Sequence, residues 1–151
     1  MPLLSAPGDL GPTTDADLVA EWPHSIALLG PWQYYHGYCV LVARTHVSEL
    51  IHLPDAERIA YFEEMCALAR AIERAVRPHK LNYELLGNQV PHLHWHLFPR
   101  SADDPHRLNP VWLDLERAKQ DSAVEARLRT GPEPREQTIA RLRRELRPAG
   151  R

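Results

Sequence analysis

Residues 92–98 read HLHWHLF, and this stretch decides the fold and most of the chemistry of the chain. On a β-strand, successive side chains point to opposite faces of the sheet. The alternation therefore predicts a strand over residues 90–98, with His92, His94 and His96 on one face and apolar side chains on the other. Three imidazoles in a row contribute little to packing, but near neutral pH they supply donors, acceptors and nucleophilic nitrogens. The imidazole face is therefore the candidate site.

Three further short segments are expected to be strands, which predicts an α+β fold with a mainly antiparallel sheet. Residues 25–29 and 82–86 are short and mostly apolar, and a glycine follows each of them. Residues 37–43, GYCVLVA, form a nearly unbroken apolar run that is typical of a strand buried on both faces. Residues 101–110 are expected to be a loop.

Three helices are expected. The clearest covers residues 55–76, and a C-terminal amphipathic helix is expected over residues 134–147. A short helix is expected over residues 14–22, where Thr14 can cap the first turn and Pro23 stops the last. The apolar stripe of the long helix has a member every three or four positions: Ile59, Phe62, Cys66, Ala69, Ile72 and Val76.

Length and composition indicate one ordinary globular domain. The chain has 151 residues, of which 44% are hydrophobic and 25% charged, and this excludes a long disordered regulator. Its longest apolar runs are too short to span a membrane, and its first residues lack the basic and apolar regions of a secretory signal. Cys39 and Cys66 are expected to be reduced core thiols in a cytoplasmic protein.

The net charge of −2 argues against sequence-specific nucleic-acid binding, and no membrane partner is expected. Residues 127–151 are strongly basic, unlike the rest of the chain, because they carry eight Arg and three Glu. Such a run can contact phosphates, but a solvated helix face is the more ordinary interpretation.

Three uses of the histidines compete. Two imidazoles at i and i+2 can share a metal, but His92 and His96 are about 13 Å apart along a strand, too far for all three to share one ion. A second use is purely structural, on a hydrated sheet face. The third is phosphate chemistry, in which one imidazole attacks phosphorus while its neighbours hold oxygens and protonate the leaving group. The pattern favours the third use, with His94 as the nucleophile.

The stretch resembles the signature of the histidine triad (HIT) superfamily, His-φ-His-φ-His-φ-φ, at every position. Residues 82–92, NYELLGNQVPH, are similar to the bacterial, diadenosine polyphosphate hydrolase-like branch, and residues 36–47 are similar to the family's P-G-H strand. The resemblance covers about residues 23–115. It divides the chain into an N-terminal extension, 1–22, a HIT domain, 23–115, and a helical, Arg-rich C-terminal extension, 116–151.

The resemblance implies a HIT-like fold of five strands with one long helix and a C-terminal helix, assembled as a homodimer. It implies attack on the α-phosphorus of a nucleotide and a nucleotidyl-histidine intermediate. By position, His94 is the nucleophile, His96 contacts the phosphate and the bridging oxygen, and His92 orients the catalytic imidazole. Asn88 and Gln89 fall where the family binds phosphate or the leaving group.

The expected activity is therefore hydrolysis or transfer at the α-phosphorus of dinucleoside polyphosphates or nucleoside phosphoramidates. Alternatives are a phosphorylase, in which phosphate replaces water, and a nucleotide-binding module with little turnover. No tightly bound cofactor and no metal at the triad are expected, although Mg²⁺ can accompany the substrate phosphates.

Two positions depart from the family pattern. Gly30 stands where the family often has an Asp or Asn that contacts the ribose, and Tyr38 stands where P-G-H has its histidine. Trp32 and Tyr38 are candidate nucleotide contacts, and the aromatic residues 32–35 are expected to be hidden in the homodimer. Five other histidines are expected to be surface residues or to make local hydrogen bonds: His24, His46, His52, His79 and His106.

Overall fold

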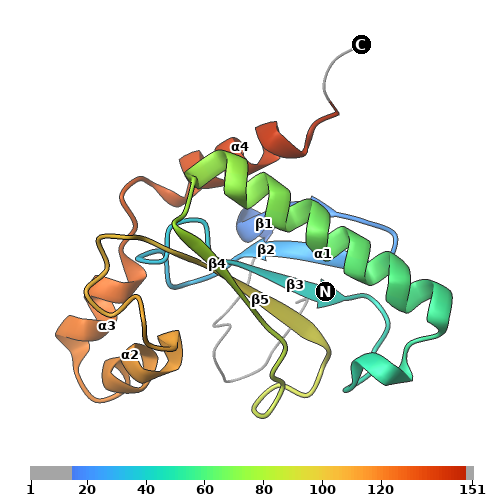
Figure 1. Ribbon diagram of the computed structural model, residues 1–151, viewed down its shortest axis with the longest axis horizontal. Coiled ribbons are helices and arrows are strands. Elements are labelled where there is room, and N and C mark those ends of the chain that lie inside the picture. The colour runs from blue at the N-terminus through green and yellow to red at the C-terminus, as the bar shows by residue number, and fades with distance from the viewer. Residues whose placement is uncertain (1–14, 149–151) are drawn as a thin grey trace.

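The computed structural model describes residues 15–148, which contain one five-stranded sheet with helices on both faces (Figure 1). The strand order is β1-β2-β3-β5-β4, and every neighbouring pair is antiparallel. This confirms the predicted α+β class and the five-stranded antiparallel sheet. The strands are β1 (Leu18–Glu21), β2 (Ser25–Leu29), β3 (Cys39–Ala43), β4 (Lys80–Glu84) and β5 (His94–Arg100).

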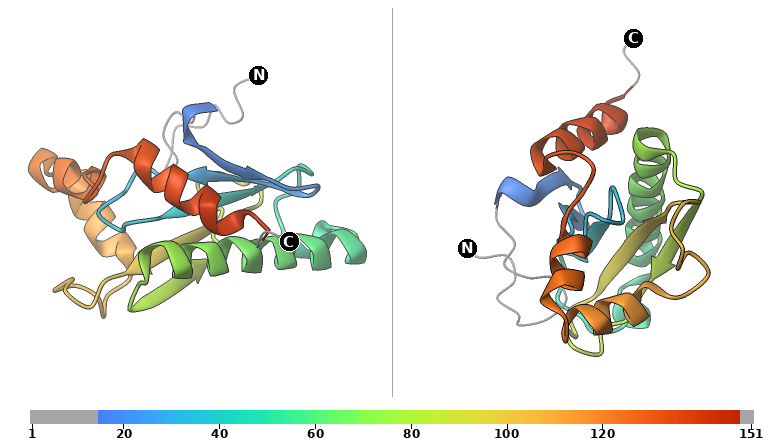
Figure 2. Two further views of the ribbon diagram at one scale, coloured as in Figure 1. Left: turned by 90° about the horizontal axis from the view of Figure 1, so that it is seen from above. Right: turned by 90° about the vertical axis from the view of Figure 1, so that its left-hand side faces the viewer.

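The helices form two layers around the sheet (Figure 2). One face is covered by α1 (Asp55–Val76) and α4 (Arg135–Leu146), which lie side by side. The other face is covered in part by α2 (Val111–Ala118) and α3 (Ser122–Arg129). Two short 3₁₀ segments, η1 (Asp15–Asp17) and η2 (Leu50–His52), complete the described chain. None of the helices in residues 15–148 combines the length and the apolar character that a membrane span needs.

Helix α1 has the predicted bounds, but its predicted apolar stripe is wrong in the first half. Ile59 is 64% exposed and Phe62 is 45% exposed. The buried face instead carries Tyr61, Met65, Leu68 and Ile72, which also recur every three or four positions. Two helical faces of this sequence therefore satisfy the same periodicity, and packing against the sheet selects one of them.

Polar contacts fix this rotation of α1. The hydroxyl of Tyr61 donates to the carbonyl oxygen of Leu41 in β3, at 2.8 Å. The buried carboxylate of Glu64 accepts from the Ser25 hydroxyl at 2.5 Å and from the backbone N–H of His24 at 3.1 Å. A buried carboxylate is tolerated where its oxygens are hydrogen-bonded.

The helix predicted over residues 14–22 is wrong. Thr14 lies outside the described residues, and the rest of the segment forms η1 and then β1, which pairs with β2. The chain reverses through a tight turn in which the Trp22 N–H donates to the Ser25 carbonyl oxygen at 2.9 Å. A four-residue strand at the sheet edge shows too little periodicity in sequence to be told from one helical turn.

Strand β5, which carries two of the three histidines, and strand β4 before it are shifted from their predicted positions. β4 starts and ends two residues earlier than predicted, and β5 starts at His94 and continues through Pro99 and Arg100. His92 therefore precedes the strand. It lies in the connection that follows the turn at Gly87, whose φ of +99° suits glycine.

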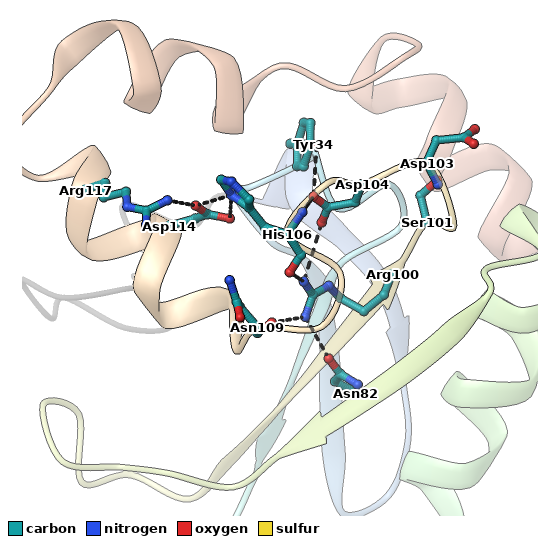
Figure 3. A network of polar contacts seen from close by, with 10 residues as sticks. All are labelled: Tyr34, Asn82, Arg100, Ser101, Asp103, Asp104, His106, Asn109, Asp114 and Arg117. Atoms are coloured by element: carbon teal, nitrogen blue, oxygen red, sulfur yellow. Dashed lines mark hydrogen bonds and ion pairs between the residues drawn. The ribbon is translucent and has the colours of Figure 1, made fainter.

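The predicted loop at 101–110 and the predicted C-terminal helix are confirmed, whereas α2 and α3 were not predicted. Arg100, which is buried, holds the loop in place (Figure 3). Its Nη1 donates to Asn82 Oδ1 at 3.1 Å and to the Asn109 carbonyl oxygen at 2.8 Å, and its Nη2 donates to the His106 carbonyl oxygen at 3.0 Å. This clamp fixes the start of α2 against the histidine face.

The structure also bears on the predicted three-part division. β1 lies in the predicted extension 1–22 but pairs with β2, and α2 continues across the predicted boundary at residues 115 and 116. α4 packs against both α1 and β1. The described parts of both extensions thus pack against the central region.

Candidate active site

His94 and His96 form the centre of the site. Both belong to β5 and point to the same face of the sheet, as the alternation predicts. Their Nε2 atoms lie 3.1 Å apart, and their ring planes are tilted by 76°. His94 is 5% exposed and His96 is 2% exposed, so both imidazoles are largely withdrawn from solvent.

The orientation of His94 is fixed by a backbone group. Its Nδ1 lies 2.7 Å from the carbonyl oxygen of His92. A carbonyl oxygen only accepts hydrogen bonds, so Nδ1 must carry the proton. In the neutral ring, Nε2 of His94 then has the lone pair. This is the arrangement that a nucleophilic imidazole requires.

The side chain of His92 makes two contacts away from the strand. Its Nε2 donates to the Ala43 carbonyl oxygen at 2.6 Å, and its Nδ1 lies 2.7 Å from Nδ1 of His46. The first contact ties the residue that orients His94 to the end of β3. His46 was expected to be a surface residue or to make local hydrogen bonds, but it contacts His92, which lies 46 positions further along the chain.

Tyr38 supports His96 from the other side. Its hydroxyl lies 2.8 Å from Nδ1 of His96, and its ring stacks on Phe98 with centroids 3.9 Å apart. A Cβ at position 30 would lie 2.2 Å from the Tyr38 ring, so Gly30 leaves the space that the ring fills. The two departures from the family pattern, Gly30 and Tyr38, are therefore one packing unit.

The burial of Tyr38 bears on its predicted role as a nucleotide contact. Tyr38 is 0% exposed, so it lies beneath the site and presents no surface on which a base could stack. Its position supports a role through His96 instead. The predicted contact with a nucleotide has no support in the position of this side chain.

His96 is held neutral. Burial, with a smaller contribution from neighbouring His94, lowers the pKa of His96 to about 3. A neutral imidazole has one N–H and one acceptor nitrogen, so one nitrogen of His96 donates and the other accepts in its contacts with Tyr38 and His94.

Two further residues lie beside His96, and neither was predicted as a site residue: Trp112 and Glu84. The Trp112 ring, on α2, lies 5.3 Å from the His96 ring in an edge contact. Its Nε1 donates to Glu84 Oε2 at 2.6 Å, and Glu84 is the cross-strand partner of His96 in the sheet. Burial raises the pKa of the Glu84 carboxyl above its usual value.

The remaining predicted residues are more peripheral. Asn88 and Gln89 lie in the connection between β4 and β5 with exposed side chains. They are accessible to a ligand, but the contacts that define the triad do not include them. Trp32 packs beside the buried aromatic residues, and the guanidinium of Arg129 lies 4.4 Å from its ring centre.

Within residues 15–148, no three His, Cys, Asp or Glu side chains are arranged to hold a metal ion. A cavity of about 830 Å³ lies at the Arg100 end of β5, between Tyr34, Val76 and Gly131. No triad residue lines it, so the chemistry of the imidazoles, rather than cavity size, marks the candidate site.

Comparisons with known proteins agree with this geometry. A family model described as the HIT domain matches residues 12–103. The Bacillus subtilis protein called Protein hit is 31% identical over 87 residues, which make up 54% of this chain. The chain spans 60% of the length of that relative.

Solved structures show the same fold. A histidine triad protein from Bradyrhizobium japonicum is 26% identical, with a TM-score of 0.59 over 74% of this chain and 91% of that one. One from Marinobacter aquaeolei is also 26% identical, with a TM-score of 0.58 over 75% and 90%. A protein from Sulfolobus tokodaii, described as a hypothetical histidine triad nucleotide-binding protein, is 16% identical and has a TM-score of 0.63 over 86% of this chain and 83% of that one. At that identity it shows the fold alone.

Proposed function

The chain belongs to the HIT domain family, and we propose that it is a nucleotide hydrolase or transferase that acts at the α-phosphorus of dinucleoside polyphosphates or nucleoside phosphoramidates. The single observation that carries the proposal is the orientation of His94. Because its Nδ1 donates to the His92 carbonyl oxygen, the lone pair of its neutral ring is on Nε2. An imidazole held in this way is an activated nucleophile.

The first step forms a bond between His94 Nε2 and the α-phosphorus and breaks the bond from phosphorus to the leaving group. A phosphate leaving group departs as an anion with the electron pair of that bond. The nitrogen of a phosphoramidate departs with the same pair and gains a proton from solvent as it leaves. The product is a nucleotidyl-imidazolium, whose positive charge is stabilised by the hydrogen bond from Nδ1 to the His92 carbonyl oxygen.

The second step uses water. Water attacks the same phosphorus, the phosphorus–nitrogen bond breaks, and neutral His94 is regenerated. The water oxygen remains on the nucleoside monophosphate, and its surplus proton passes to solvent. If phosphate attacks in place of water, the product is a nucleoside diphosphate and the enzyme is a phosphorylase.

A binding module with little turnover is the second candidate. The small exposed area of His94 and His96 and the 3.1 Å contact between their Nε2 atoms favour it. A substrate must separate these two nitrogens before His94 can attack. Slow turnover would follow if that separation costs more free energy than substrate binding releases.

The proposal includes no metal ligand among the three histidines, because each of their ring nitrogens already contacts another imidazole, the Tyr38 hydroxyl or a backbone carbonyl. Mg²⁺ is proposed only as a companion of the substrate phosphates, where it would neutralise charge on the leaving group. The partner is a nucleotide, and no tightly bound cofactor is proposed. The free thiols of Cys39 and Cys66 support a cytoplasmic location.

Product analysis tests the proposal. The protein is incubated with a diadenosine polyphosphate and with an adenosine phosphoramidate, each with and without added phosphate, and His94→Asn is the matched control. Nucleoside monophosphate formed by the wild type alone supports the hydrolase, and nucleoside diphosphate formed only with phosphate supports the phosphorylase. Tight nucleotide binding without any product would contradict both enzyme activities and support the nucleotide-binding module.

A further inference from the structure

We propose that Tyr38 is a positioning residue that holds His96 in the tautomer with its proton on Nε2, the nitrogen that faces the nucleophile His94. This inference rests on the proposed function for its catalytic consequence. Its structural content, the location of one proton on His96, can be tested without turnover.

The hydrogen-bond geometry carries the proposal. A neutral imidazole has one N–H and one acceptor nitrogen. The Tyr38 hydroxyl lies 2.8 Å from Nδ1 of His96, and Nε2 of His96 lies 3.1 Å from Nε2 of His94. If Tyr38 donates to Nδ1, the proton of His96 must be on Nε2.

The opposite tautomer conflicts with a nucleophilic His94. With the proton on Nδ1, the lone pair of His96 Nε2 would face the lone pair of His94 Nε2 at 3.1 Å. That contact becomes favourable only if His94 gains a second proton, because its Nδ1 already donates to the His92 carbonyl oxygen. A doubly protonated His94 has no lone pair for attack.

The packing of Tyr38 makes it suited to this role. The ring lies between Gly30, where no Cβ would fit, and Phe98, on which it stacks. Its backbone is fixed at both ends, since its N–H donates to the Tyr35 carbonyl oxygen and its carbonyl oxygen accepts from the Gly30 N–H, each at 2.8 Å. The phenol is therefore held with its hydroxyl at Nδ1.

The catalytic consequence is electrostatic. When the substrate separates His94 from His96, the Nε2–H of His96 becomes available to the bridging oxygen. Negative charge develops on that oxygen as the bond to phosphorus breaks, and a prepositioned donor stabilises it. With a dinucleoside polyphosphate the leaving oxygen departs as an anion, so no proton needs to leave His96 in this step and its ring remains neutral.

Two matched variants separate positioning from packing. Tyr38→Phe removes the hydroxyl and keeps the stacked ring. Tyr61→Phe is the control, because Tyr61 is equally buried and its hydroxyl donates to a backbone carbonyl at 2.8 Å, but on the other face of the sheet. The ring-nitrogen signals of ¹⁵N-histidine-labelled protein report which nitrogen of His96 carries the proton.

In wild-type protein and in Tyr61→Phe, we expect Nε2 of His96 to be protonated and Nδ1 to be an acceptor. In Tyr38→Phe we expect a mixture of tautomers. We also expect kcat to fall on the order of tenfold, with KM within about twofold, because only a transition-state donor is disturbed.

The wild-type spectrum alone can overturn the proposal, so it stays testable even if Tyr38→Phe does not fold. A proton on Nδ1 of His96 in the wild type would contradict it. An unchanged tautomer and an unchanged kcat in folded Tyr38→Phe would also contradict it. If no substrate is turned over by any of the proteins, the proposed function fails, while the ¹⁵N signals still decide the role of Tyr38.

Discussion

The Tyr38 hydroxyl lies 2.8 Å from Nδ1 of His96, on the side of the imidazole opposite to its contact with His94. The site is thus a line of side chains that runs from a buried phenol to the nucleophile. Its members are Tyr38, directly before β3, His94 and His96 in β5, and His92 in the segment before β5. A substitution at one of these residues should therefore affect the geometry of the others.

The first prediction concerns the space above Gly30. A Cβ at this position would lie 2.2 Å from the Tyr38 ring, so Gly30→Ala should destabilise the protein by about 1–3 kcal/mol through overpacking. Urea denaturation measures the change in the free energy of unfolding. In a Tyr38→Ala background the added methyl group has room, and most of the cost should disappear. An equal cost in both backgrounds would show that the two positions are not coupled.

The second prediction concerns sugar recognition. With glycine at position 30 and the Tyr38 ring packed over it, no carboxylate from this position can accept from the ribose hydroxyls. A site that lacks such an acceptor discriminates weakly against a missing hydroxyl. We expect kcat/KM for a 2′-deoxynucleotide substrate to be within about threefold of the value for the ribonucleotide. A preference of about a hundredfold for the ribonucleotide would mean that another residue binds the ribose.

The third prediction follows from the lowered pKa of His96. Its pKa is about 3 in the folded protein and about 6.5 in the unfolded chain, so below pH 6.5 the unfolded state binds the extra proton. This group therefore stabilises the fold fully above about pH 6.5, and that contribution is lost as the pH falls toward 3. The loss approaches about 1.4 kcal/mol per pH unit in that window.

Urea denaturation at several pH values between about 7 and 4 tests this prediction. Other groups titrate in the same range, so the informative quantity is the difference between wild type and His96→Gln, which has no proton to gain at this position. The wild type should lose more stability on acidification than the variant. Parallel curves would show that His96 is already accessible to protons in the folded state.

Some helices and strands of this fold could be predicted from the sequence, and others could not. The bounds of α1 and β2 were predicted correctly, because a long periodic run and a short apolar run next to glycine are strong local signals. The buried face of α1 was predicted incorrectly, because the apolar stripe that contains Ile59 and the one that contains Tyr61 both have helical spacing. The contacts of Tyr61 with Leu41 and of Glu64 with Ser25, which join α1 to distant strands, distinguish them.

The site shows the same limit. The alternation of residues 92–98 predicts that His94 and His96 share a face, since that depends only on strand geometry. The contacts of Tyr38 with His96, of His46 with His92 and of Trp112 with Glu84 join residues 58, 46 and 28 positions apart. Such contacts depend on strand register and on the placement of α2, neither of which is encoded in a local pattern.

The fourth prediction concerns assembly. The aromatic surface expected at residues 32–35 is largely covered, since Tyr35 is buried and Arg129 lies over Trp32. Other apolar side chains are exposed instead: Ile59 and Phe62 on α1, Tyr83 on the edge strand β4 and Leu86 just after it. Exposed apolar side chains beside an unpaired strand edge favour association. We expect a homodimer of about 35 kDa, twice the 17.3 kDa chain.

Sedimentation at micromolar concentration measures the assembly. Tyr83→Lys should shift the protein toward the monomer, because it places a charge on the expected interface. Leu108→Lys is the matched control, since Leu108 is 88% exposed but lies in the loop before α2. A wild-type monomer, or equal effects of the two variants, would contradict a dimer through this surface.

The central claim is that His94 becomes covalently attached to the nucleotide, and rapid quenching followed by mass spectrometry of the digested protein tests it most directly. With a substrate that is cleaved at the α-phosphorus, we expect one acid-labile nucleotidyl group on the peptide that contains His94. In His94→Asn the adduct should be absent, nucleotide binding should remain within about tenfold, and turnover should fall by several orders of magnitude. An adduct on another residue, or turnover by His94→Asn near the wild-type rate, would contradict the account.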